Sequence, residues 1–269
     1  MKHSLLRARS LSRLAATLLV ATVAIPAMSG ACAAATLRFG TDPSYPPYEY
    51  KLPDGRLAGL DIDIGNAMCA AANVKCEWVE SSFDGLIAAL QARKFDAINA
   101  SMAPTAARRA VMDFTQPVYA ADIRLVAARG SRLAPDAASL AGKRVGVLQG
   151  STQAAFVKSS WERRGVLVRE YPDQDSIYAD LVNGRLDATL VVGSQARLGF
   201  LTKPQGARFE LAGPRIEDPS ILGASSVIGV RKGDGKTLQT LDAALARIKQ
   251  DGTLSRLEKQ YLGDAPAAK

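Results

Sequence analysis

Short apolar, β-rich runs alternate with longer segments of helical periodicity along most of the chain. Short apolar runs bounded by turn residues are typical of buried strands, and apolar residues at helical spacing predict amphipathic helices. The predicted strands are 36–40, 77–79, 97–99, 144–148, 166–169 and 188–192. The predicted helices between them are 61–72, 83–92, 152–161 and 176–183. This alternation predicts an α/β protein with parallel sheets covered by helices.

Two stretches of the chain resemble each other. Residues 90–97 read Leu-Gln-Ala-Arg-Lys-Phe-Asp-Ala and residues 181–188 read Leu-Val-Asn-Gly-Arg-Leu-Asp-Ala, so each ends a helix and enters a strand through Asp-Ala. A first strand precedes each of them, at 38–41 and 144–147. The pairing predicts two similar α/β units in succession, with chance similarity of generic turns as the alternative.

A further strand, 225–230, and two amphipathic helices, 238–250 and 254–261, follow the second unit. These helices need a surface to cover, and the first unit has fewer helices of its own, so we expect the chain to return to it. Two crossings form a hinge, and the carboxyl ends of both sheets then face one cleft. The predicted organisation is lobe 1 in 36–119 plus 226–264, lobe 2 in 123–219, a hinge in 120–122 and 220–225, and a flexible tail in 265–269.

The first 35 residues have the pattern of an export signal. Four basic residues precede an apolar run over 14–25, and small residues at 31–35 suit a signal peptidase. The run is shorter than the roughly 20 residues of a membrane span. We therefore expect a signal peptide in residues 1–35 and a soluble mature protein that is secreted or periplasmic. A buried helix is the alternative, although it would place those basic residues beside a core.

Loss of the leader would change the charge balance. The chain has 34 Lys and Arg against 26 Asp and Glu; four of the basic residues belong to the leader, which leaves 30 against 26 and a charge of +4 instead of +8. The remaining positive charges are scattered among acids, which argues against a nucleic-acid partner. The remaining length, about 235 residues, suits one large domain or two small ones.

Three cysteines are present, at 32, 69 and 76. Cys32 falls in the cleavage region, which leaves Cys69 and Cys76 as an even pair in an oxidising compartment. We predict that they form a disulfide, with two buried free thiols as the alternative. Lipid modification of Cys32 is a second possibility, but residues 29–31 lack the bulky aliphatic residue expected before such a cysteine.

Four motifs along the chain match a known family. They are Gly-Thr-Asp-Pro-Ser-Tyr-Pro-Pro-Tyr-Glu at 40–49, Gly-Leu-Asp-Ile-Asp-Ile at 59–64, Gly-Val-Leu-Gln-Gly-Ser-Thr-Gln at 146–153, and Asp-Ala-Ile at 96–98 followed by Thr105 and Arg108. Together they resemble the periplasmic amino-acid-binding proteins of ABC importers, solute-binding protein family 3. The resemblance spans 36–261 and is closest to the histidine- and lysine/arginine/ornithine-binding branch, which carries a cysteine pair at the same spacing. It implies a two-lobed periplasmic-binding-protein fold (type II), with two open mixed sheets flanked by helices and joined by a two-segment hinge.

The resemblance also implies a site for the carboxylate of a free amino acid. Arg108 is the implied clamp, because a guanidinium donates two parallel charge-assisted hydrogen bonds to a carboxylate. Without the resemblance, an arginine beside Arg109 would more often be a solvated surface residue. Ser101 and the backbone near Ser151 and Thr152 are implied as further donors, and a helix start at Thr152 would itself attract an anion.

A second set of residues is implied to hold the ligand side chain. Tyr45 and Phe83 fall where the family sandwiches that side chain, and Leu148 lies in the second-lobe loop nearby. Aromatic faces attract cationic or planar groups, although core packing is the alternative role of Phe83. Asp42 resembles the acid that meets a positively charged distal group; capping the turn at Pro43 is its alternative role.

Three ligand-binding positions depart from the basic-amino-acid branch. Val192 stands where those relatives place an aspartate that neutralises the ligand's α-ammonium, and Ala100 and Ala103 stand where they have serines. An ammonium buried against valine would lose an ion pair and its hydration. Either another group reaches that nitrogen or the ligand, like an opine, lacks a free primary ammonium.

These residues suggest a monomeric receptor that closes on an amino acid or derivative with a cationic side chain and presents it to an inner-membrane ABC permease complex. No cofactor or metal is expected, since the mature chain has no histidine and its acids lack calcium-binding spacing. One alternative is a periplasmic enzyme on the same scaffold, resembling cyclohexadienyl dehydratases. That chemistry needs a poised proton donor, and the single histidine, His3, lies in the leader. A ligand-sensing protein not coupled to transport is the other alternative.

Overall fold

The computed structural model describes residues 35–263. The predicted signal peptide, residues 1–35, lies outside this range except for its last residue, as does the predicted tail, residues 265–269. Among the helices of the described range, none is long and apolar enough to cross a membrane.

A first five-stranded sheet has the order β5–β1–β6–β15–β7. Its strands are β1 (Thr36–Thr41), β5 (Lys75–Glu80), β6 (Ala97–Ile98), β7 (Met112–Phe114) and β15 (Gly229–Arg231). β1 runs parallel to β5 and β6, whereas β15 runs antiparallel to β6 and β7. The helices on this side are α1 (Leu60–Ala72), α2 (Leu86–Gln91), α3 (Ala106–Val111), α7 (Gly235–Gln250) and α8 (Thr253–Leu262).

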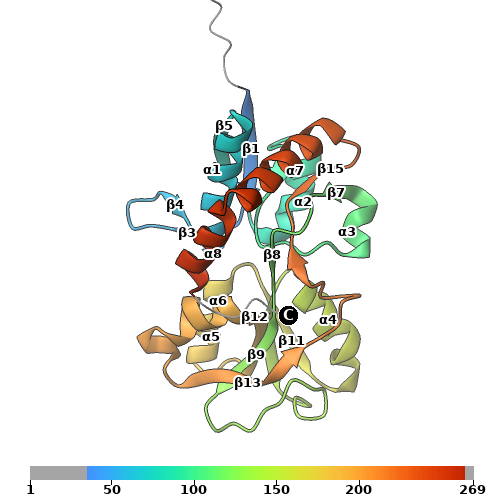
Figure 1. The fold of residues 1–269 in the computed structure, drawn as a ribbon. Helices are drawn as coiled ribbons and strands as arrows, with labels where there is room; N and C mark the ends of the chain where they lie inside the picture. Colours follow the sequence, from blue (N-terminus) through green and yellow to red (C-terminus); the bar gives the residue numbers. More distant parts are fainter. Residues whose placement is uncertain (1–34, 264–269) are drawn as a thin grey trace, which may run out of the picture. The chain divides into compact units, whose positions relative to one another are not determined.

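The end of the chain returns to this first sheet. Helix α7 buries Leu241, Ala244, Leu245 and Ile248, which form one stripe at helical spacing. Figure 1 shows α7 and α8, coloured orange to red, lying against α1, with which both are in contact. The stripe is therefore covered, and segments from both ends of the described range share one core.

A second five-stranded sheet has the order β11–β10–β12–β9–β13. Its strands are β9 (Ile123–Ala128), β10 (Arg144–Leu148), β11 (Leu167–Tyr171), β12 (Ala188–Val192) and β13 (Phe209–Ile216). β10 runs parallel to β11 and β12, and β9 runs antiparallel to β12 and β13. Its helices are α4 (Thr152–Ser160), α5 (Gln174–Val182) and α6 (Gly193–Gln195), the last continuing as a π-helical segment (Ala196–Leu201). Two open, mixed sheets flanked by helices confirm the predicted fold class.

The two similar sequence stretches, 90–97 and 181–188, take part in the same kind of Arg–Asp contact. The Arg38 backbone N–H and Nε both donate to Oδ2 of Asp96, at 3.1 Å each. In the second sheet Arg144 does the same with Asp187, at 2.8 and 2.9 Å. In each unit the contact ties the first strand to the Asp-Ala entry of the third, which explains why both residues recur at matching places.

Several antiparallel pieces differ from the sequence prediction. The predicted strand 225–230 is two strands: β14 (Ser225–Ser226) pairs with β8 (Tyr119–Ala120), and β15 joins the first sheet. A small sheet of β2 (Ser44–Tyr45), β3 (Glu49–Lys51) and β4 (Leu57–Ala58) was not expected either. These strands are short, and β13 contains Gly213-Pro214, so local sequence reads them as turns.

The predicted disulfide between Cys69 and Cys76 is present. Cys69 lies in the last turn of α1, and Asn73 ends that helix in the left-handed conformation, with φ of 54°. Asparagine tolerates this conformation better than most residues, so the chain can turn back at once into β5. The turn brings Cys76 of β5 beside the end of the helix.

Reduction of this disulfide should destabilise the protein modestly. Its loop spans a sequence separation of 7, and chain-entropy arguments for so short a loop give about 2 to 3 kcal/mol of unfolding free energy. Urea denaturation with and without reductant measures the change. The variant C69A/C76A serves as control and should not respond to reductant; an unchanged midpoint in the wild type would contradict the expectation.

Candidate functional site

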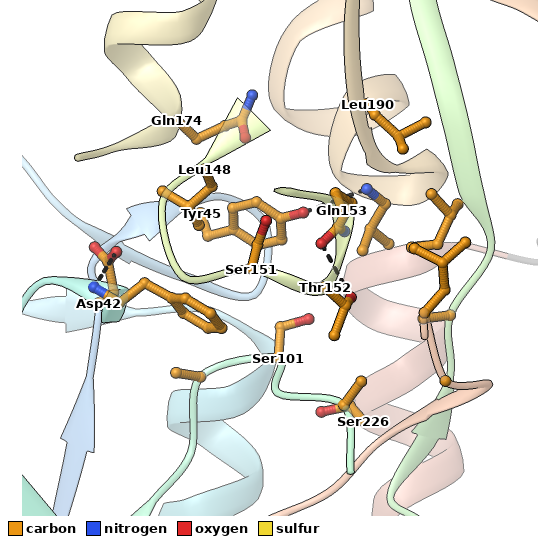
Figure 2. A pocket seen from close by; sticks show the side chains of 18 of the residues that line it. Asp42, Tyr45, Ser101, Leu148, Ser151, Thr152, Gln153, Gln174, Leu190 and Ser226 are labelled. Atoms are coloured by element: carbon orange, nitrogen blue, oxygen red, sulfur yellow. Dashed lines mark hydrogen bonds between the residues drawn. The ribbon is translucent and has the colours of Figure 1, made fainter. Parts of the chain in front are cut away.

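A cavity lies where the carboxyl ends of strands from both sheets meet, as is usual for ligand sites in open α/β sheets. It receives side chains from the segments that follow β1, β6, β10 and β11 and from the end of β12. All eleven ligand-site residues singled out from the sequence line it: Asp42, Tyr45, Phe83, Ala100, Ser101, Ala103, Arg108, Leu148, Ser151, Thr152 and Val192. Figure 2 shows Ser101, Ser151 and Thr152 near the middle, with Asp42 and Leu190 on opposite sides.

The Arg108 guanidinium is the central cation of the cavity. Its side chain starts from α3, where the Thr105 hydroxyl accepts the Arg108 backbone N–H at 3.2 Å and caps the helix. The guanidinium donates to the carbonyls of Ala103 at 2.8 Å and Gly150 at 3.1 Å. Gly150 has φ of 72°, a conformation that glycine adopts without strain and that accompanies this carbonyl orientation.

Arg108 is 8% exposed, and burial lowers the pKa of its guanidinium to about 10. Among residues 35–263, no carboxylate lies within ion-pair distance of it, although the more exposed arginines Arg38 and Arg144 pair with aspartates. A buried cation held only by neutral carbonyls carries a large desolvation penalty. The arrangement therefore calls for an anion from outside the chain.

The start of α4 adds donors beside Arg108. The Ser151 hydroxyl accepts the Ala154 backbone N–H at 3.0 Å, so Ser151 is the N-cap and Thr152 the first helical residue. The first N–H groups of a helix have no partner within it and favour an anion. Because Gly150 contacts Arg108, this helix terminus and the guanidinium face the same space, which fits a carboxylate.

At Ser101 the backbone N–H already has a partner, whereas within the described part of the chain the hydroxyl does not. Its N–H donates to Oδ2 of Asp61 at 2.6 Å, and its φ is 48°. The Ser101 hydroxyl, by contrast, is buried without a hydrogen-bonding partner among the described residues. An unpaired buried hydroxyl is costly, so it too is suited to a polar ligand.

Aromatic side chains form the walls. The Arg108 guanidinium carbon lies 5.4 Å from the centroid of the Phe83 ring, a cation–π distance. Tyr45 stacks with Tyr48, with ring centroids 6.1 Å apart. Leu148 closes the wall from the second sheet. Phe83 and Tyr45 thus face the cavity while remaining part of the core.

Asp42 and Glu49 are the acids of the cavity lining. Asp42 is 6% exposed; its Oδ2 accepts the Phe83 N–H at 3.1 Å, and burial raises the pKa of its carboxyl. The sequence prediction missed Glu49, as well as Gln153 and Gln174. Glu49 and Gln153 belong to the matched motifs, so the sequence could have identified them. Gln174 lies outside those motifs, and no neighbouring residue indicates that it enters the cavity.

The Val192 side of the cavity is apolar. Val192 lines it together with Ile123 and Leu190. Asp122, whose carbonyl accepts the Gly193 N–H at 2.7 Å, directs its carboxylate to Arg124 at 3.9 Å and Arg197 at 3.8 Å. The described part of the second sheet's side therefore contributes no acidic residue to the cavity lining that could replace the aspartate expected at position 192.

Three hydrogen bonds within residues 35–263 join the first sheet's side to the second's, and two of them involve residues of the cavity lining. Arg108 donates to Gly150, the Tyr45 hydroxyl accepts the Val192 N–H at 3.3 Å, and the Tyr48 and Ser194 hydroxyls are bonded to each other. These contacts hold the two sheets together around the cavity.

A two-lobed α/β protein with a polar cavity between its lobes has the architecture of a small-solute receptor. The chain belongs to the bacterial extracellular solute-binding proteins, family 3, whose pattern matches residues 37–264. Its fold is accordingly that of the two-domain periplasmic binding proteins, as the resemblance implied.

Individual relatives agree with this assignment. The chain is 44% identical over 250 residues to the lysine/arginine/ornithine-binding periplasmic protein of Escherichia coli K12, covering 93% of this chain and 96% of that protein. It is 42% identical over 225 residues to the histidine-binding periplasmic protein of Salmonella typhimurium, covering 84% and 86%. A solved Salmonella typhimurium periplasmic binding protein, described for its high arginine specificity, superposes with a TM-score of 0.79 at 30% identity, covering 85% of this chain and all of that one.

The Tyr48–Ser194 contact should contribute to the stability of the whole protein. Replacing Tyr48 by phenylalanine keeps the buried ring and removes one hydrogen bond, so we expect about 1 kcal/mol less unfolding free energy in urea denaturation. Ser194→Ala should cost a similar amount, and the double variant should lose little more than either single variant. Strictly additive losses would contradict a direct contact between the two hydroxyls in solution.

Proposed function

We propose that this protein is the periplasmic substrate-binding component of an ABC importer, and that it captures an amino acid or amino-acid derivative by hinge closure and presents it to a membrane permease. The observation that carries the proposal is the buried Arg108 guanidinium, which lacks a carboxylate partner among the described residues and lies beside the start of α4. An amino acid supplies the missing carboxylate, and charge-assisted hydrogen bonds to it are short and strong. The family of the chain supports the same conclusion.

A cationic ligand side chain fits the rest of the cavity. Asp42 offers a carboxyl group at the end opposite Leu190 (Figure 2), and Tyr45 and Phe83 offer aromatic faces. Relatives whose names specify lysine, arginine, ornithine or histidine support this preference. Asp42 would meet the distal cation, and Arg108, Ser101, Ser151 and Thr152 the α-carboxylate.

Closure would take place about the two crossings between the sheets. We keep the predicted limits, with lobe 1 in 36–119 plus 226–264, lobe 2 in 123–219 and the hinge in 120–122 and 220–225. The short antiparallel pair β8–β14 brings the two crossings side by side, which supports a hinge there. Few residues would then absorb the motion, as in other hinged receptors.

We further propose that the cavity performs no chemistry on its ligand. The relatives compared above are binding proteins, which supports this reading. The cavity does hold one group suited to donate a proton, since burial raises the pKa of Glu49 well above its usual value. Incubation with prephenate or arogenate is the direct test: we expect no aromatic product, and its formation would favour the dehydratase alternative.

Arg108→Ala should abolish tight binding. Truncating one partner of a buried charge pair costs enough to raise the dissociation constant roughly 30-fold or more. Isothermal titration of the mature protein with L-arginine, L-lysine, L-ornithine and L-histidine measures the effect. Arg109→Ala is the matched control, since Arg109 is exposed and stacks over Phe114 away from the cavity lining. Equal affinities in the two variants would refute the carboxylate clamp.

A further inference from the structure

The cavity contains an acid that the site as described does not use. Of the two acids in its lining, Asp42 accepts a hydrogen bond from Phe83 and lies at the end assigned to the distal cation. Glu49 is 1% exposed, lines the same cavity and has no assigned partner in the ligand. A carboxyl group so placed needs a physical reason, because its ionised form is costly to bury.

The position of Glu49 is set by the hairpin β2–β3. Glu49 pairs across the two strands with Tyr45, and such partners direct their side chains to the same face. The Tyr45 hydroxyl accepts the Val192 N–H, and in Figure 2 it points away from Asp42. Glu49 therefore stands beside the side chain that reaches the Val192 side of the cavity.

Glu49 is also in contact with the segment that would hold the ligand carboxylate. Its carboxyl group interacts with that of Asp61, and this interaction contributes to the raised pKa of Glu49. Asp61 in turn accepts the Ser101 N–H at 2.6 Å and the Tyr119 hydroxyl at 2.6 Å. One carboxyl group thus separates Glu49 from Ser101, and in an amino acid the α-nitrogen is only two bonds from the carboxylate carbon.

Part of Glu49 is left without a donor. Among residues 35–263, no N–H or O–H group donates to its buried Oε2. Two carboxyl groups that meet need one proton between them, and in that contact Glu49 is the donor to Asp61. Whichever oxygen of Glu49 does not meet Asp61 can accept a hydrogen bond, and an ammonium group is a strong donor.

We propose that the Glu49–Asp61 carboxyl pair receives the α-ammonium of the ligand, through the oxygen of Glu49 that does not face Asp61. The inference rests on the function proposed above. It identifies the counter-charge for the ligand's α-ammonium, which Val192 does not supply. It also assigns the ligand class: an amino acid with a free α-ammonium, rather than one whose α-nitrogen is substituted.

The charge of the pair fits this role. Burial and the neighbouring Asp61 raise the pKa of Glu49 well above its ordinary value, and burial raises the pKa of Asp61 to about 6. The other titratable groups that act on the pair are Asp42, Tyr45, Tyr48 and Tyr119. Asp61 therefore carries a negative charge at pH 7 and loses it below about pH 6. Affinity for the ammonium should fall as the pH is lowered through that value.

The test compares L-arginine with 5-guanidinopentanoic acid, which is arginine without its α-amino group. The wild type should prefer arginine at pH 7.5 by roughly tenfold or more, the value of a charge-assisted hydrogen bond. Glu49→Met removes the acceptor and should bring the ratio of the two dissociation constants close to one. Glu49→Gln keeps an oxygen for the ligand and a donor for Asp61, so it should retain the preference. A structural role alone would weaken both ligands equally and leave the ratio unchanged.

The outcomes separate this inference from the proposed function. A wild type that binds neither arginine nor 5-guanidinopentanoic acid, and none of L-lysine, L-ornithine and L-histidine, refutes the cationic ligand class and the inference together. A wild type that binds arginine while Glu49→Met keeps the wild-type ratio refutes the inference alone, as does a wild type that shows no preference for arginine. Loss of the preference in Glu49→Gln, to the same degree as in Glu49→Met, would also overturn the shared-proton pair.

Discussion

The site depends on one unbalanced charge. Arg108 is buried, and among the described residues only the neutral carbonyls of Ala103 and Gly150 accept its guanidinium hydrogens. Elsewhere in the fold, half-exposed arginines such as Arg38 and Arg144 have aspartate partners. A cation deprived of both water and a counter-ion raises the free energy of the closed protein unless an anion joins it. The contacts around Arg108 hold it in place for that anion.

The repeated α/β unit explains where this charge can be satisfied. β1 lies between β5 and β6, and β10 lies between β11 and β12 in the same way; one Arg–Asp contact ties β1 to the start of β6, and an equivalent contact ties β10 to the start of β12. Two such units facing each other present their carboxyl-terminal loops to a common space. Asp42 and Ser101 therefore come from one sheet, and Ser151 and Val192 from the other. A ligand between them contacts both lobes at once, so its binding is coupled to closure.

Sequence reasoning succeeded for the central strands and for the site residues that directly follow them. β10 and β12 have the predicted bounds, and the site residues that follow such strands were found through motifs at their ends. It failed where position depends on pairing that local pattern does not fix. The hairpin that turns Glu49 toward the cavity is made of strands too short to show a periodic pattern. β14 and β15 read as one run in the sequence, but they pair with strands of different sheets. Gln174 likewise enters the cavity through tertiary packing alone.

The charges of the cavity also account for why closure needs a ligand. Arg108 and the Glu49–Asp61 pair lie on the first lobe with opposite sign, yet they do not neutralise each other, because no ion pair joins them within the described range. An amino acid carries the complementary pair of charges a short distance apart. In the open protein water can solvate each group separately, whereas in the closed protein only a zwitterion satisfies both. The ligand thus has a differential affinity for the closed state, which is the condition for a binding event to drive a conformational change.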